Sequence, residues 1–221
     1  YQIGYASNGY MHIVDLETGR DVNIGNPGSD ANRTSASPDG QWIALWSLQE
    51  GSIWQLGLLN TSTWQQAGRG EFKIGFPTLS WSPDSRQLAF AAIPEGETLA
   101  LPNHELFVMN IETGETRQLT NNTVLDYAPA FSPDGKRLVF TSTADGFNRL
   151  YILDIATDES HLLTDQTFGY LPSWSPDGKQ LVFASNHEYR NNQIYVINAD
   201  GTNLRRLTDN NATNEFPFWL P

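Results

Sequence analysis

Cysteine is absent from the 221-residue chain, which excludes disulfide bonds, thiolate catalysis and cysteine-ligated metals. Basic residues are scarce: there are 13 Lys and Arg against 25 Asp and Glu, and the net charge of −12 disfavours nucleic acid and anionic membrane surfaces as partners. No apolar run approaches the roughly 18 residues of a membrane-spanning helix, and the N-terminus lacks a signal-peptide pattern. We therefore expect a soluble, monomeric domain without membrane insertion, and we interpret the start at Tyr1 as a sign of processing or of excision from a longer chain.

Helical periodicity of useful length is also absent, and a short repeat dominates the sequence instead. The motif Ser-Pro-Asp-Gly begins at Ser37, Ser132 and Ser175, and Ser82 begins the near copy Ser-Pro-Asp-Ser. The steps between these motifs are 45, 50 and 43 residues. A second marker, an Asp or Asn that closes a short apolar run, keeps nearly the same interval at Asp15, Asn60, Asn110, Asp154 and Asn198. Two markers with one period indicate an array of structural repeats.

Each repeat unit predicts four short strands separated by turns. In the repeated motif, proline presets the backbone for a tight turn, Asp accepts local hydrogen bonds, and Gly tolerates the left-handed region. The predicted first strands end at Trp81, Phe131 and Trp174, the second strands contain 88–90, 138–140 and 181–183, the third strands contain 106–109, 150–153 and 194–197, and the fourth strands carry Leu119, Leu163 and Leu207.

The two ends of the chain together supply one repeat unit. Ile3 to Ser7 aligns with a second strand, and Phe216 to Pro221 aligns with a first strand. We therefore predict an all-β fold, a single five-bladed β-propeller over residues 1–221 built of four-stranded antiparallel blades and closed by N- and C-terminal strands that share one blade. The expected blades are 1–30 plus 212–221, 31–74, 75–124, 125–167 and 168–211.

The run Pro172 to Gly178, Pro-Ser-Trp-Ser-Pro-Asp-Gly, and the apolar run Leu150 to Asp154 resemble the TolB-like propeller repeat, a distant relative of the Trp-Asp (WD40-like) repeat. This resemblance covers nearly the whole chain and implies the propeller fold and a periplasmic or extracellular location. It does not fix a function, because similar repeats occur in Tol-system proteins, prolyl-peptidase relatives and oligogalacturonate lyases. Since the protein that gives the family its name is six-bladed, five blades imply either a natural variant or an excised or engineered ring.

The expected entrance of the central channel differs from blade to blade, so it is the candidate binding site. It combines aromatic rings with acids and one arginine, a mixture suited to a peptide or a sugar ring. The candidate binding residues are Asn32, Arg33, Phe76, Asp126, Tyr127, Tyr170 and Glu215. Alternatively, the aromatic residues at these positions only plug the channel.

Three functions remain open from the sequence. The leading one is a non-catalytic binding or scaffolding propeller that recognises a protein, peptide, small ligand or carbohydrate on the face around the channel. The second is a carbohydrate-active enzyme, a glycosidase or lyase, whose carboxyl pair at the channel mouth is Asp126 and Glu215. The third is a structural or engineered ring without a ligand. We expect no cofactor and no metal, because the four histidines fall at inconsistent positions of the repeat: His12, His104, His161 and His187.

Overall fold

The computed structural model describes residues 2–7, 10–15, 17–25, 34–48, 54–63, 65–73, 78–96, 103–187 and 191–219. These residues form antiparallel sheets whose strands follow one another in chain order, one of three strands and four of four strands. The three-stranded sheet contains β1 (Gln2–Ser7), β2 (Tyr10–Asp15) and β3 (Asp21–Gly25). The next sheets are β4 (Thr34–Ala36), β5 (Trp42–Leu48), β6 (Trp54–Asn60) and β7 (Gln66–Phe72), then β8 (Leu79–Trp81), β9 (Gln87–Ala92), β10 (Glu105–Asn110) and β11 (Thr116–Gln118). The last two are β12 (Asp126–Phe131), β13 (Arg137–Ser142), β14 (Arg149–Asp154) and β15 (Ser160–Leu162), then β16 (Tyr170–Trp174), β17 (Gln180–Ser185), β18 (Gln193–Asn198) and β19 (Arg205–Arg206).

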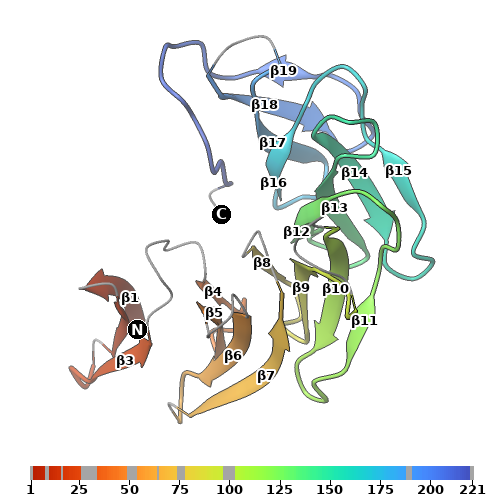
Figure 1. Cartoon of the computed structure of the whole chain (residues 1–221). Coiled ribbons are helices and arrows are strands. Elements are labelled where there is room, and N and C mark those ends of the chain that lie inside the picture. The colour runs from red at the N-terminus through yellow and green to blue at the C-terminus, as the bar shows by residue number, and fades with distance from the viewer. Residues whose placement is uncertain are drawn as a thin grey trace.

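The sheets succeed one another around a common centre, each with its first strand innermost (Figure 1). The inner strands β4, β8, β12 and β16 contact one another in that order. This arrangement confirms the all-β propeller with four-stranded antiparallel blades. Among the described residues, no helix is long and apolar enough to cross a membrane.

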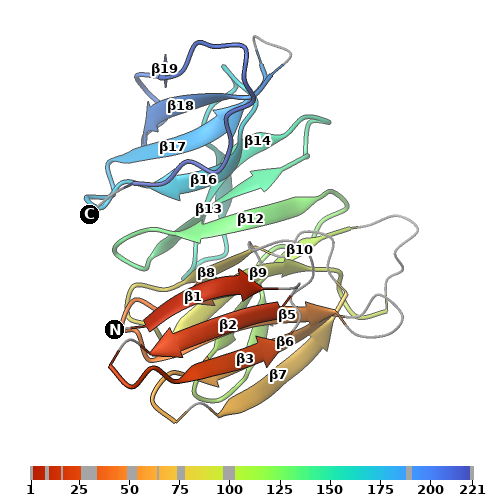
Figure 2. The ribbon, with the colours of Figure 1, turned by 90° about the vertical axis from the view of Figure 1, so that its left-hand side faces the viewer.

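The predicted pairing of the chain ends is not formed among the described residues. Strand β1 pairs with β2, and the described residues after β19 carry no strand. The sheet β1–β3 and the sheet β16–β19 therefore stand at the two ends of an open arc, and the C-terminal segment runs to its centre (Figures 1 and 2).

The C-terminal segment Phe216–Trp219 nevertheless has the geometry of an inner strand. Phe216 has a φ of 54°, which matches 52° at Ala128 and 54° at Leu171, the residues before proline in β12 and β16. The Trp219 indole donates to the Ser173 carbonyl at 3.2 Å. The segment is thus held by the preceding blade, which explains how it can take its place beside β16 without a partner in β1.

The Ser-Pro-Asp-Gly motif forms the predicted turn through side-chain hydrogen bonds. Ser132 Oγ donates to Asp134 Oδ1 at 2.6 Å and accepts the Arg137 amide at 3.0 Å. Asp134 Oδ1 also accepts the Lys136 amide at 3.0 Å, and these bonds, the serine bond first, lower the pKa of Asp134. Gly135 takes the left-handed region at φ 70°, as the turn requires. The same serine-to-aspartate bond recurs at Ser37, Ser82 and Ser175.

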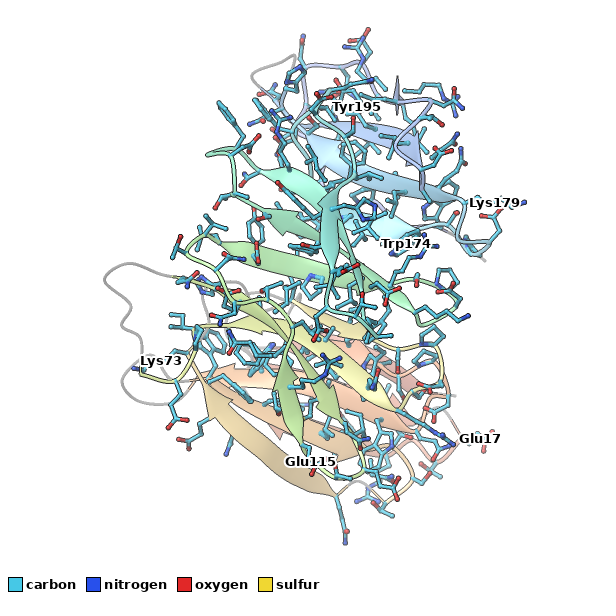
Figure 3. The ribbon with its side chains drawn as sticks, turned by 90° about the vertical axis from the view of Figure 1, so that its right-hand side faces the viewer. Glu17, Lys73, Glu115, Trp174, Lys179 and Tyr195 are labelled. Atoms are coloured by element: carbon cyan, nitrogen blue, oxygen red, sulfur yellow. The ribbon has the colours of Figure 1, made fainter. Side chains whose placement is uncertain are left out.

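The apolar core lies between neighbouring blades. Each second strand from β5 to β17 buries one large aromatic residue almost completely: Trp46, Phe90, Phe140 and Phe183. Trp174 packs between the β12–β15 sheet and its own sheet, with its indole donating to the Ala130 carbonyl at 3.1 Å (Figure 3). Trp81 makes the equivalent bond to the Ser35 carbonyl at 3.0 Å. These residues join each blade to the next, so the repeat period sets the packing as well as the turns.

The fourth strands are shorter than predicted. Leu119, Leu163 and Leu207 each follow directly after the last residue of such a strand instead of lying within it. Their amides still donate to the third strand, to the carbonyls of Leu106, Leu150 and Ile194 at 2.7, 2.8 and 2.7 Å. The chain leaves the sheet at this point, while the side chains of Leu119 and Leu163 lie in the apolar core and Leu207 is 50% exposed.

Candidate functional site

The inner strands begin at one face of the propeller, which we call the loop face. Tyr127 of β12 pairs with Thr141 at the end of β13, and Tyr170 of β16 pairs with Ala184 near the end of β17. The loops between second and third strands therefore lie on the same face as the start of the inner strands. The opposite face, which carries the Ser-Pro-Asp-Gly turns, is the turn face.

We call Tyr127, Tyr170 and Glu215 the mouth, because they stand at the starts of two neighbouring inner strands and of the C-terminal segment on the loop face. Tyr127 is buried against the apolar core at 9% exposure, Tyr170 is half-buried and Glu215 is exposed. Burial raises the pKa of Tyr127 to about 12, and the nearby Tyr170 adds to this shift. Burial also raises the pKa of Tyr170, with a further contribution from the charge of Glu215. Glu215 accepts a hydrogen bond from the Asn192 side chain. The three predicted binding residues are thus electrostatic neighbours, and both phenols stay protonated at neutral pH.

A cavity of about 230 Å³ lies along the inner strands. Residues from β8, from the Xaa-Pro pairs of β12 and β16, and from the C-terminal segment line it: Thr78, Leu79, Ser80, Ala128, Pro129, Ala130, Leu171, Pro172, Phe216 and Pro217. Its walls are largely aliphatic, so the cavity offers apolar contact, whereas the hydroxyls and the carboxylate at the mouth offer polar contact.

Asp126 does not belong to this mouth, because its side chain is only 1% exposed. Its Oδ2 accepts the Asn122 side chain at 2.7 Å. Glu105, which is fully buried, accepts Thr120 Oγ1 at 2.5 Å and the Asn122 amide at 2.8 Å. Burial raises the pKa of both carboxyls, and the proximity of Asp126 adds to the shift of Glu105. We call Glu105, Thr120, Asn122 and Asp126 the carboxyl clamp.

An equivalent clamp in the last blade is made of amides. Gln193 stands where Glu105 stands and accepts Thr208 Oγ1 at 2.8 Å. Asn214 stands where Asp126 stands and donates to Asn210 Oδ1 at 3.0 Å and to Gln193 Oε1 at 3.4 Å. The side chain at this position, Asp126 or Asn214, therefore belongs to the contacts that tie the connection between two blades to a third strand. Asp126 thus has a structural role, whereas the sequence had suggested a binding role for it.

The remaining predicted binding residues, Asn32, Arg33 and Phe76, lie outside the described residues. Of the histidines, His104 is buried, whereas His161 and His187 are exposed. Within the described part of the chain, no three His, Asp or Glu side chains gather closely enough to hold a metal ion.

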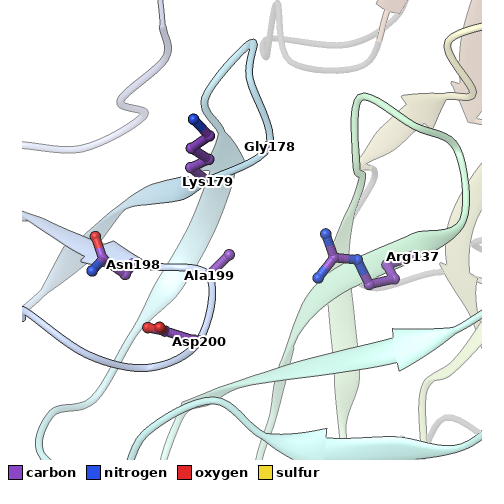
Figure 4. A pocket seen from close by; sticks show the side chains of 6 residues that line it. All are labelled: Arg137, Gly178, Lys179, Asn198, Ala199 and Asp200. Carbon is purple, nitrogen blue, oxygen red and sulfur yellow. The ribbon is translucent and has the colours of Figure 1, made fainter.

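The structure has two further hollows that the sequence did not predict, one on each face. One, of about 490 Å³, lies on the turn face between Arg137 on one side and Lys179, Asn198 and Asp200 on the other (Figure 4). The other, of about 260 Å³, lies between loops of the loop face and is lined in part by Phe147 and Phe168. The sequence feature that could have indicated the second hollow is Phe147, an aromatic residue in a predicted loop between Asp145-Gly146 and Asn148.

Antiparallel four-stranded sheets that succeed one another around a channel define a β-propeller. A model of the family described as the TolB beta propeller domain matches residues 11–171. The chain belongs to this family, which confirms the resemblance seen in the repeat.

Three similar proteins illustrate how far the likeness extends. The Tol-Pal system protein TolB of Roseobacter denitrificans is 36% identical over 61 residues, which cover 28% of this chain and 14% of that protein. The uncharacterized peptidase YuxL of Bacillus subtilis is 27% identical over 168 residues, 62% of this chain and 25% of that protein. The solved structure of TolB from Acinetobacter baumannii has a TM-score of 0.72 and 24% identity, and the match covers 90% of this chain and 48% of that one. This chain thus matches half or less of the length of each, and the last comparison shows the fold alone.

Proposed function

We propose that this chain is a non-catalytic recognition propeller that binds a protein partner at the mouth on its loop face. The observation that carries the proposal is the gathering of Tyr127, Tyr170 and Glu215 above an aliphatic cavity. Tyrosine supplies a rigid ring and a polar hydroxyl at low entropic cost, which suits protein interfaces. The TolB relatives, named as proteins of the Tol-Pal system, support a protein partner over a sugar.

The charge of the chain favours a basic partner. Its net charge is −12, and Glu215 adds a carboxylate at the mouth itself. Complementary charge raises the association rate and sets orientation more than it adds affinity. We propose a periplasmic or extracellular location by analogy with the Tol-system relatives, and we propose that the chain is a monomer.

We further propose that Phe216–Trp219 completes the β1–β3 sheet and closes a five-bladed ring. The segment already has inner-strand geometry, and closure would remove the exposed edge of β1. By the register of β16 with β17, Phe218 would lie opposite Gly4. Because the chain has no cysteine, the pair Phe218→Cys and Gly4→Cys tests this directly.

Closure predicts a disulfide within the monomer after mild oxidation, seen as a mobility shift on non-reducing gels. The control pair, Phe218→Cys with Ile13→Cys of β2, should stay reduced, because β2 lies one strand further out. A disulfide only between molecules, or none with the first pair, would contradict closure without affecting the proposed binding at the mouth.

Binding at the mouth is tested with a phage-displayed peptide library selected on the full chain, followed by calorimetry with the synthetic peptide. Tyr170→Ala combined with Tyr127→Phe should weaken binding about tenfold, chiefly through loss of the half-buried Tyr170 ring and its hydroxyl, because Tyr127 is only 9% exposed. The control Leu207→Ala, at a 50% exposed side chain beside β19, should leave affinity unchanged. Equal affinity of the double variant, with intact circular dichroism, would refute the proposal.

A glycosidase or lyase is the competing function. A glycosidase requires a second carboxyl group across the scissile bond from Glu215, and Asp126 was the candidate for it. The 1% exposure of Asp126 argues against that role. Release of reducing sugar from a polysaccharide panel, lost in Glu215→Gln, would favour the enzyme instead.

A further inference from the structure

An aromatic hollow lies on the loop face, and three segments line it: the β13–β14 loop, the connection from β15 to β16, and residues 186–187 after β17. The rings of Phe147 and Phe168 stack with centroids 4.8 Å apart and an interplanar angle of 12°. His187 meets Phe168 edge-on, with centroids 4.9 Å apart. The hollow has a volume of about 260 Å³, and Gly146, Asn148 and Asn186 complete its lining. We call these residues the aromatic hollow.

Arg149 joins the β13–β14 loop to the connection from β15 to β16. Its guanidinium donates to the carbonyls of Asp165 and Thr167 at 2.8 and 3.3 Å and pairs with the Asp145 carboxylate. It also lies 5.3 Å from the centre of the Phe168 ring. The Gly169 amide donates to the Asn148 carbonyl at 2.8 Å, which joins the two loops a second time. The aromatic hollow is therefore formed before any ligand arrives, which lowers the entropic cost of binding.

Phe147 remains 51% exposed in spite of this support. The loop ends in a turn at Gly146, with φ 82°, and presents the ring outward. A fixed and half-exposed phenylalanine adds little to the core, because much of its apolar surface stays in water. A large exposed apolar side chain in a preformed hollow is typical of a recognition surface.

The lining also specifies what the hollow would take. The Phe147 ring, stacked on Phe168 on one side and 51% exposed, leaves apolar ring surface for contact with another ring. The side-chain amides of Asn148 and Asn186 each offer a donor and an acceptor, as a peptide group requires. The charged residues within 143–149 and 163–169 are Asp145, Arg149 and Asp165, which sum to −1. Because Arg149 is already paired with Asp145, the remaining charge of Asp165 favours a cation nearby.

We propose that the aromatic hollow is an anchor subsite for an aromatic side chain of a protein partner, next to a lysine or arginine of the same segment. This deepens the proposed function, on which it rests, by naming the chemistry that the partner presents beside the mouth. An aromatic residue in a preformed pocket with a flanking basic residue is the kind of anchor on which interface energy concentrates.

The test uses small defined probes with isotope-labelled full chain. N-acetyl-Phe-Lys-amide is titrated while the backbone amide signals are followed by NMR, and it should shift the signals of 146–148, 168 and 186. N-acetyl-Ala-Lys-amide should bind about fivefold more weakly because the ring contact is lost. N-acetyl-Phe-Glu-amide should bind about threefold more weakly because of charge repulsion.

Phe147→Ala should weaken binding of the Phe-Lys probe about fivefold. Phe147→Leu should weaken it nearly as much, because leucine keeps apolar bulk but lacks the ring. The matched control is Leu162→Ala, at a 37% exposed side chain on β15 of the same sheet, and it should change nothing. Unfolding curves check that each variant is folded.

The proposal would be overturned if Phe147→Leu bound the Phe-Lys probe with unchanged affinity and unchanged NMR signal shifts. It would also be overturned if a methyl glycoside bound more tightly than the Phe-Lys probe. If the peptide selected for the mouth loses affinity through Tyr170→Ala but not through Phe147→Ala, the proposed function stands and the anchor subsite fails. If both substitutions have no effect on that peptide, both proposals fail.

Discussion

Replacing Asp126 with asparagine should stabilise the protein at neutral pH. Asp126 and Glu105 are buried carboxyls of one clamp, and burial raises the pKa of each above its ordinary value of 3.8 and 4.5. Their protonated forms are thus favoured in the folded state. The resulting stabilisation is complete below the ordinary pKa values and is lost as the pH rises through the raised pKa values.

The pH dependence of the effect follows from the linkage between protonation and folding. A tenfold difference in proton affinity between the folded and unfolded chain corresponds to about 1.4 kcal/mol in the free energy of unfolding. Asp126→Asn removes one buried charge and its repulsion of Glu105. Since an incompletely compensated buried polar group costs about 1–3 kcal/mol, we expect a gain of about 1–2 kcal/mol at pH 7.5 and a gain near zero at pH 4. The asparagine has a precedent, because Asn214 occupies the same position in the last blade and donates to Asn210 Oδ1 at 3.0 Å.

Urea unfolding followed by tryptophan fluorescence between pH 4 and 8 measures the effect. The reciprocal variant Asn214→Asp is the matched control, and it should lose about 1–2 kcal/mol at pH 7.5, because it places a carboxyl where amide hydrogens are donated. A destabilised Asp126→Asn at pH 7.5, or a difference from the native chain that does not depend on pH, would refute the argument.

Three further predictions concern the repeat. Gly201→Ala should lower the free energy of unfolding by about 3 kcal/mol or more, because a Cβ there would lie 2.2 Å from the Leu163 carbonyl oxygen. Gly114→Ala, at a similar φ with nothing within 4 Å, should lower it by only about 1 kcal/mol, and equal shifts of the melting temperature would contradict this. Asp134→Ala should cost about 1 kcal/mol at pH 7 at this exposed turn, and the cost should disappear as the pH falls through the lowered pKa of Asp134, which acid titration of stability checks. Trp174→Phe should cost about 1–2 kcal/mol in urea unfolding through loss of the indole bond to the neighbouring inner strand, and an unchanged midpoint would show that this bond contributes nothing.

The sequence predicted the features that arise from local chemistry. The turns at Ser37, Ser82, Ser132 and Ser175 form as expected, because serine, aspartate and the following amides bond within five residues. The strands between them follow from the same period. Closure could not be predicted as safely, because it depends on how the small rotation from blade to blade accumulates over the whole chain.

The candidate site was predicted only in part. Tyr127 and Tyr170 lie together at the mouth, but Asp126 precedes Tyr127 on the same strand, and successive side chains of a strand point to opposite faces. That alternation could have placed Asp126 in the clamp from the sequence alone. The aromatic hollow could not be predicted from the sequence, because Phe147 and Phe168 come into contact only when two separate loops fold beside each other.

A crystal structure of the full chain with the peptide selected for the mouth tests the central claim most directly. The claim that the loop-face mouth is the binding site predicts peptide atoms in contact with the Tyr170 ring and within hydrogen-bond distance of Glu215. Peptide bound on the turn face beside Arg137 and Lys179, with no contact at Tyr170, would contradict it.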